Sequence, residues 1–91
     1  MTFRTVINLS GQVQGVNLRA MIKVSALSLN LKGCVKNEPD GSVKIVLEGE
    51  KEKIEGLIRW LNEYRGPGKI ELLQDYWSQG RNEFDDFTIK Y

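Results

Sequence analysis

Apolar and polar positions alternate near the start of the chain and then change to a helical spacing. Every second residue of the first segment would lie on one side of an extended chain: Phe3, Thr5, Ile7 and Leu9. After a turn bracketed by Gly11 and Gly15, apolar residues recur every three or four positions: Leu18, Ile22, Ala26 and Leu29. This spacing is typical of one face of a helix. We therefore predict a strand over Phe3–Leu9 and a helix over Leu18–Leu29.

A hairpin is predicted after this helix. The helix should end at Asn30, because Asn often replaces Gly at the left-handed residue that follows a helix. Strands are expected at Leu31–Asn37 and Ser42–Gly49, joined by a turn at Glu38–Gly41 that contains Pro and Gly. The second of these strands alternates between an apolar and a polar side: Val43, Ile45 and Leu47 on the one, Lys44 and Glu48 on the other.

The rest of the chain predicts one more helix and two more strands. The helix should run from Lys51 to Tyr64, with an apolar stripe formed by Ile54, Leu57, Ile58 and Leu61. Gly66-Pro67-Gly68 would stop it, because Pro cannot continue a helix. The remaining expected elements are a strand at Lys69–Trp77, a polar loop at Ser78–Glu83 and a strand at Asp86–Tyr91.

This order of elements predicts an α+β fold of the ferredoxin-like, split β-α-β kind. Two helices would pack on one face of a mainly antiparallel sheet of four to five strands. The 91 residues leave room for one domain, which we expect to span residues 1–91. No apolar run approaches the roughly 18–20 residues of a membrane span, and the opening residues lead directly into a strand, so we expect neither a membrane segment nor a signal peptide.

Charge and aromatic placement argue against a nucleic-acid binder. The net charge is only +1, from 13 basic and 12 acidic residues, so bulk electrostatics would not hold a phosphate backbone. An RNA-recognition domain has a similar order of strands and helices, but it stacks bases on aromatic residues of its central strands. The segment 43–47 has no aromatic residue.

The stretch Gly11–Arg19 carries the strongest chemical signal. Its two glycines permit backbone angles that let several N–H groups converge on one anion. The following helix start adds further N–H groups and a partial positive charge, and Arg19 adds a planar cation that fits phosphate oxygens. The pattern indicates a site for a phosphate-sized anion. The alternative is a tight strand-to-helix connection with a surface arginine.

Other kinds of catalytic chemistry find little support. The chain has no histidine, which removes the usual general base and any Ser-His triad. The single cysteine, Cys34, excludes an internal disulfide and is expected to be a small buried hydrophobe. Neighbouring carboxylates, at Asp85-Asp86 and at Glu38 with Asp40, are interpreted as surface charges.

Several short motifs follow one another along the chain. Gly11–Arg19 reads Gly-x-Val-Gln-Gly-Val-x-x-Arg, and after it come Gly33-x-Val35-x-Asn37, Asp40-Gly41-x-Val43, Gly66-Pro67 and Phe87-x-Ile89. Over nearly the whole length of the chain, these motifs resemble, in register, those of the acylphosphatase family, and the first is similar to the family's signature. The resemblance implies the ferredoxin-like fold. It also implies hydrolysis of the carboxyl-phosphate bond of small acyl phosphates by direct attack of water.

The resemblance also assigns roles to residues. Arg19 would bind the phosphoryl group and Asn37, otherwise a typical turn former at a strand end, would hold the attacking water. The phosphate-binding loop would comprise Gly15, Val16, Asn17, Leu18 and Arg19. No metal and no cofactor are implied, and the partners would be an acyl phosphate substrate and inorganic phosphate as product. We expect the first two helix-linked strands to lie close together, so that Arg19 and Asn37 face one pocket. A cytoplasmic monomer is also expected.

Three positions depart from the family pattern. Leu18 replaces an aromatic residue before the arginine, Cys34 replaces a tryptophan, and Glu38 places a negative charge beside Asn37. If the Glu38 side chain pointed inward, it would repel an anionic substrate. The alternative function is therefore a catalytically weak or inactive acylphosphatase-like domain that binds a phosphorylated ligand or partner.

Overall fold

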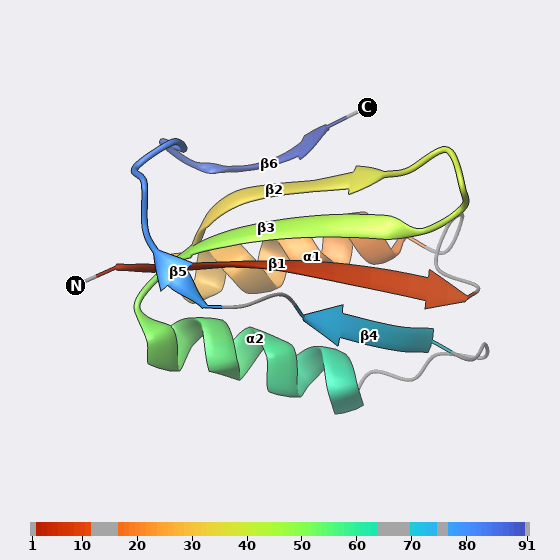
Figure 1. The fold of residues 1–91 in the computed structure, drawn as a ribbon, viewed down its shortest axis with the longest axis horizontal. Coiled ribbons are helices and arrows are strands. Elements are labelled where there is room, and N and C mark those ends of the chain that lie inside the picture. The colour runs from red at the N-terminus through yellow and green to blue at the C-terminus, as the bar shows by residue number, and fades with distance from the viewer. Residues whose placement is uncertain (1, 12–16, 64–69, 75–76, 91) are drawn as a thin grey trace.

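The computed structural model describes residues 2–11, 17–63, 70–74 and 77–90 (Figure 1). In chain order, the elements are β1 (Phe3–Gly11), α1 (Leu18–Ser28), β2 (Lys32–Asn37), β3 (Val43–Gly49), α2 (Lys51–Glu63), β4 (Ile70–Gln74), β5 (Ser78–Gln79) and β6 (Phe87–Lys90). The bounds agree closely with those predicted, except that Trp77, predicted to end the fourth strand, is not part of β4. The predicted positions that lie outside the described residues are Tyr64, the helix stop Gly66-Pro67-Gly68, Lys69, Asp75, Tyr76 and Tyr91.

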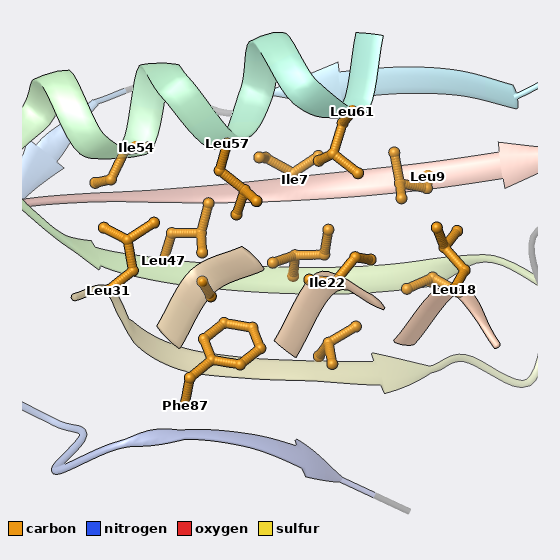
Figure 2. Packing of buried hydrophobic residues seen from close by; sticks show 14 residues of the cluster. Ile7, Leu9, Leu18, Ile22, Leu31, Leu47, Ile54, Leu57, Leu61 and Phe87 are labelled. Carbon is orange, nitrogen blue, oxygen red and sulfur yellow. The ribbon is translucent and has the colours of Figure 1, made fainter. Parts of the chain in front are cut away.

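The strands form one mixed sheet in the order β4-β1-β3-β2-β6, with β5 paired to β1. All neighbouring pairs are antiparallel except β2 and β6, which run parallel. Both helices cover the same face of this sheet, which confirms the ferredoxin-like α+β prediction (Figures 1 and 2). We call this the helix face and the other the open face.

The sheet has one more strand than the sequence indicated. Ser78 and Gln79, predicted to lie in a polar loop, form β5 and pair with Arg4 and Phe3 of β1. The loop prediction was wrong because a two-residue polar strand has no alternating pattern, and its pairing depends on the edge that β1 offers.

The core lies between the helix face and the two helices (Figure 2). The predicted apolar positions supply it, since Ile7 and Leu9 of β1, Ile22 of α1 and Leu57 of α2 are each at most 1% exposed. Asn30 has a φ of 57°, which confirms the left-handed residue that ends α1. No helix among the described residues is long and apolar enough to cross a membrane.

Gly33 lets β2 lie close to β3. Its φ is 141°, and a Cβ atom at this position would collide with the backbone carbonyl oxygen of Val46 on the neighbouring strand. The Gly33 N–H donates to the carbonyl oxygen of Asp86, 3.0 Å away, just before β6 begins. A larger residue would therefore disturb the strand that carries Asn37.

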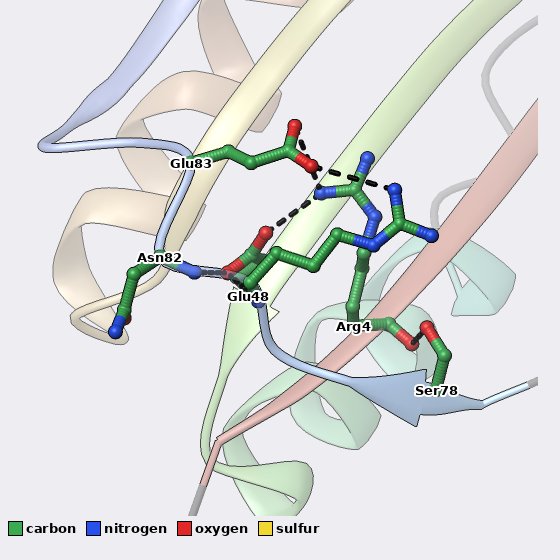
Figure 3. Close-up of polar contacts among 6 residues, drawn as sticks. Arg4, Glu48, Ser78, Asn82 and Glu83 are labelled. Carbon is green, nitrogen blue, oxygen red and sulfur yellow. Dashed lines mark hydrogen bonds and ion pairs between the residues drawn. The ribbon is translucent and has the colours of Figure 1, made fainter.

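A partly buried ion pair fixes the end of the sheet where β1 begins (Figure 3). Arg4 of β1 lies opposite Glu48 of β3 on the open face, with its Nη1 2.7 Å from the Glu48 Oε2. The other Glu48 oxygen accepts the backbone N–H groups of Arg81 and Asn82, each at 3.0 Å. Glu48 is 4% exposed, although it lies on the polar side of its strand. These contacts attach the segment that leads to β6.

Candidate active site

The carboxyl ends of β1 and β2 lie at the same end of the sheet. Both strands are antiparallel to β3 and therefore run in the same direction. Leu9 of β1 and Asn37 of β2 both pair with Val43 of β3, so β2 ends level with Leu9, and β1 continues for two more residues to Gly11. They are not adjacent, because β3 lies between them, which puts them about 10 Å apart. The two strands therefore lie close together, as predicted, but they are not hydrogen-bonded to each other.

Helix α1 begins at this same end. Leu18, its first residue, is 1% exposed and belongs to the buried cluster that also contains Leu9. Figure 2 shows both side chains at the end of the core where β1 and β2 finish. Leu18, which stands in place of an aromatic residue, thus anchors the helix start in the core. Arg19 follows it in the first turn and is half-buried.

The backbone at the start of α1 leaves several N–H groups without a partner inside the helix. Asn17 has φ 59° and ψ 17°, the left-handed conformation, and helical residues follow it directly. A left-handed residue followed by a right-handed one turns successive N–H groups toward a common point. The first backbone hydrogen bond of the helix joins the Met21 N–H to the Asn17 carbonyl oxygen at 3.2 Å. The N–H groups that precede Met21 in the first turn have no carbonyl acceptor within the helix.

Neither the N-cap side chain nor an acidic residue compensates the partial positive charge at the start of α1. The Asn17 side chain makes no capping hydrogen bond within the described part of the chain, although an N-cap side chain usually accepts one. The first turn of α1 also has no acidic residue that could neutralise the helix dipole. This arrangement fits the prediction that Asn17, Leu18 and Arg19 bind an anion. Gly15 and Val16, the other two predicted loop residues, lie outside the described residues.

Asn37 carries a buried side-chain oxygen that has no hydrogen-bond partner among the described residues. It is the last residue of β2, and alternation along the strand puts its side chain on the helix face with that of Val35. Within the described residues, its Oδ1 is the buried side-chain oxygen or nitrogen for which no hydrogen-bond partner is present. Leaving such an atom unpaired costs about 1–3 kcal/mol. Asn37 therefore places an unpaired buried acceptor at the same end of the sheet as the start of α1.

The other two departures from the family pattern lie on the open face. Glu38 lines a shallow depression together with the open-face residues Val6, Asn8 and Lys44. The depression lies on the side of the sheet away from the Asn37 side chain. Cys34 is 7% exposed and pairs with Val46 of β3, which is also buried on the open face. This confirms the expected role of Cys34 as a small buried hydrophobe.

Comparison with known proteins decides the family. The sequence model of the family described as acylphosphatase matches residues 5–89. The chain belongs to the acylphosphatase family. A relative named acylphosphatase from Paenarthrobacter aurescens is 40% identical over 88 residues, which cover 97% of this chain and 94% of the relative. Another from Geotalea uraniireducens is 36% identical and covers both chains completely.

Solved structures show the same fold. The crystal structure of acylphosphatase from Bacillus subtilis superimposes with a TM-score of 0.88 at 27% identity, covering 98% of this chain and 99% of that one. Full-length HypF matches with a TM-score of 0.89 at 32% identity, where this chain is covered completely and 12% of HypF is matched. The acylphosphatase fold therefore occurs both as a whole chain and as a small part of a larger one. These relatives support acylphosphatase activity rather than a non-catalytic binding domain.

Two features of the site gave no clear signal in the sequence. The left-handed conformation of Asn17 was not predicted, although Asn adopts it more readily than most residues. The unpaired oxygen of Asn37 depends on packing around the strand end, which the sequence does not specify.

Proposed function

We propose that this acylphosphatase hydrolyses the carboxyl-phosphate bond of small acyl phosphates at the end of the sheet where β1 and β2 finish. One observation carries the proposal. The outward-facing N–H groups at the start of α1 and the buried Oδ1 of Asn37 occur at the same end of the sheet. The N–H groups could donate to the oxygens of a phosphoryl group, and the Asn37 Oδ1 could accept a hydrogen bond from a water molecule.

The N–H groups of Asn17, Leu18 and Arg19 would bind the oxygens of the phosphoryl group. Backbone donors at a helix start are already oriented, so they stabilise negative charge without reorganising during the reaction. The Arg19 guanidinium would add two parallel hydrogen bonds and a full positive charge. Gly15 and Val16 are proposed to complete this binding loop, as the resemblance implies.

Asn37 would orient the attacking water. Its Oδ1 accepts a hydrogen bond from the water and leaves an oxygen lone pair directed at phosphorus. A new bond forms between the water oxygen and phosphorus, while the bond from phosphorus to the acyl oxygen breaks. The products are inorganic phosphate and a carboxylate, and the water proton passes to a phosphate oxygen or to solvent. Because the leaving carboxylate has a pKa of about 4, it needs no general acid.

The positions of the hydrogen-bond donors, the Arg19 charge and the attacking water would therefore provide the rate enhancement, and no general acid or base would be needed. Phosphoryl transfer depends mainly on positioning and on electrostatic support of the transferred group. This agrees with a sequence that contains no histidine. The proposal needs no metal, no cofactor and no covalent intermediate.

We also propose that the protein acts as a cytoplasmic monomer and that its 91 residues form one domain. Its free cysteine, Cys34, is buried, which is compatible with a reducing compartment. Size-exclusion chromatography with light scattering would test the monomer.

Turnover of a generic acyl phosphate tests the proposed activity. Purified protein should hydrolyse benzoyl phosphate, and inorganic phosphate should inhibit competitively because it occupies the same N–H groups. Binding of phosphate without any hydrolysis would instead support the alternative function, a binding domain for phosphorylated ligands.

A further inference from the structure

The turn that follows Asn37 is closed by a carboxylate. Asp40 lies at the tip of the β2–β3 hairpin, and its Oδ1 accepts two hydrogen bonds from Ser42. The Ser42 backbone N–H donates at 2.9 Å and the Ser42 hydroxyl at 2.6 Å. One carboxylate oxygen therefore holds both the backbone and the side chain of the residue just before β3.

Backbone hydrogen bonds link this carboxylate contact to the strand end. The Glu38 N–H donates to the Ser42 carbonyl oxygen at 2.8 Å, and the Gly41 N–H donates to the Glu38 carbonyl oxygen at 3.0 Å. Gly41 has a φ of 93°, which allows the chain to reverse within these few residues. Ser42 is therefore held by Asp40 on one side and by Glu38 on the other, and Glu38 directly follows Asn37.

Asn37 depends on this backbone for its position. Its Oδ1 has no hydrogen-bond partner among the described residues, so no such bond fixes the amide oxygen before a ligand arrives. Its backbone pairs with Val43, the residue after Ser42. How the hairpin closes therefore affects where the Asn37 backbone, and with it the amide, lies.

We propose that Asp40 is a positioning residue for Asn37, acting through Ser42 and the closed hairpin turn. The proposal rests on the water-orienting role proposed for Asn37. Asp40 itself does not touch the substrate. It keeps the end of β2 in the geometry that aims the amide oxygen at the water.

The protonation behaviour of Asp40 agrees with this role. Hydrogen bonds from the Ser42 hydroxyl and then from the Ser42 N–H lower the pKa of the Asp40 carboxyl below its ordinary value of 3.8. A depressed pKa means that the contribution of the carboxylate is fully present above the ordinary value. It is lost as the pH falls through the folded-state value. Glu38 and Lys44 are the charged groups that line the same depression, and the turn stays closed at neutral pH.

Three substitutions at Asp40 separate geometry from charge. Asp40→Ala removes the acceptor, and we expect kcat to fall about tenfold, because small misplacements of a catalytic group are costly. The inhibition constant of inorganic phosphate should not change, since the anion site is on α1. Asp40→Asn keeps an Oδ1 acceptor and should retain most of kcat. Asp40→Glu keeps the charge but moves the oxygen, and it should lose kcat as the alanine variant does.

Asp85→Ala is the matched control, because Asp85 is an exposed carboxylate away from the hairpin. Its kcat should equal that of the wild type. A wild-type kcat in both Asp40→Ala and Asp40→Glu would overturn the proposal. So would a proportional loss of kcat and phosphate affinity, which would indicate a general distortion.

A double-substitution cycle tests whether Asp40 acts through Asn37. In the Asn37→Ala background, Asp40→Ala should cause no further loss of kcat, because the group that it positions is gone. Independent, multiplicative losses would contradict the proposal while leaving the role of Asn37 intact. A wild-type kcat in Asn37→Ala alone would instead refute the water-orienting role, so the two failures are distinguishable.

Discussion

At the end of the sheet where β1 begins, Arg4 and Glu48 form a partly buried ion pair. At the end where β1 and β2 finish, Asn37 keeps a buried oxygen without a partner among the described residues. The first end, which we call the closed end, uses its polar groups to attach the segment before β6. The second, the site end, leaves the hydrogen-bonding capacity of this oxygen unused. The same strands β1 and β3 contribute to both ends, so the difference lies in the side chains and not in the fold.

The closed end shows what folding does with buried polar groups when no ligand is involved. Glu48 makes hydrogen bonds with Arg4 and with two backbone N–H groups, so its charge is compensated. At the site end, we expect the start of α1 and the Asn37 oxygen to receive a phosphoryl group and a water molecule. Stability and catalysis are therefore expected to respond in opposite ways to substitutions at the two ends.

The largest effect is expected at Arg19. Arg19→Ala should lower kcat/KM for benzoyl phosphate by about a thousandfold, because the cation supports charge on the phosphoryl group. Arg19→Lys should recover little, because an ammonium lacks the planar fork. Steady-state kinetics measure both. Hydrolysis by Arg19→Ala at the wild-type rate would remove Arg19 from the mechanism.

A loss of stability without a loss of chemistry is expected at the closed end. Glu48→Gln removes the nearer of the two carboxylates beside Arg4 and weakens the hydrogen bonds to two backbone N–H groups, so it should lower the free energy of unfolding by about 3 kcal/mol. Urea denaturation measures this, and kcat should stay near the wild-type value. Glu83→Gln is the control, because Glu83 is 43% exposed and lies 3.6 Å from Arg4. It should change stability by less than about 0.5 kcal/mol. Equal effects of the two substitutions would argue against the buried pair.

The reverse is expected at Asn37. Asn37→Ala should lower kcat by about a hundredfold, because the water loses its orienting acceptor. It should leave the inhibition constant of phosphate unchanged and should not lower the melting temperature, since it removes an unpaired buried oxygen. A lowered melting temperature together with weakened phosphate binding would show that Asn37 is structural.

The smallest effect concerns the anion itself. Inorganic phosphate at tenfold its Kd should raise the free energy of unfolding by about 1.4 kcal/mol, because it binds the folded state only. The shift should disappear in Arg19→Ala and persist in Glu48→Gln. A phosphate shift of wild-type size in Arg19→Ala would place the anion elsewhere.

Local patterns were enough to predict most of the fold. Alternation predicted β1 and the apolar side of β3, and the helical stripes predicted α1 and α2, because burial of one face follows directly from spacing. The two-residue strand β5 and the burial of Glu48 were not predictable in this way. Both depend on contacts between segments far apart in sequence, such as Arg4 with Glu48 and with Ser78.

The site was predictable in part, and by a different route. Arg19 and Asn37 were assigned from motifs that resemble a family, and the structure has both at one end of the sheet, on the side covered by the helices. From the spacing of Gly11, Gly15 and Arg19 alone, Arg19 could equally have been a surface residue after a tight turn. The left-handed Asn17 and the unpaired Asn37 oxygen became visible only with coordinates. The catalytic and binding roles, those of Gly15 and Val16 included, stay predictions.

The most direct test follows the oxygen atom of the attacking water. Benzoyl phosphate is hydrolysed by the purified protein in water labelled with oxygen-18, and both products are analysed by mass spectrometry. Attack on phosphorus at the site end places the label in inorganic phosphate and leaves benzoate unlabelled. Label in the benzoate would mean attack on the carbonyl carbon, and it would contradict the roles proposed for Arg19 and Asn37.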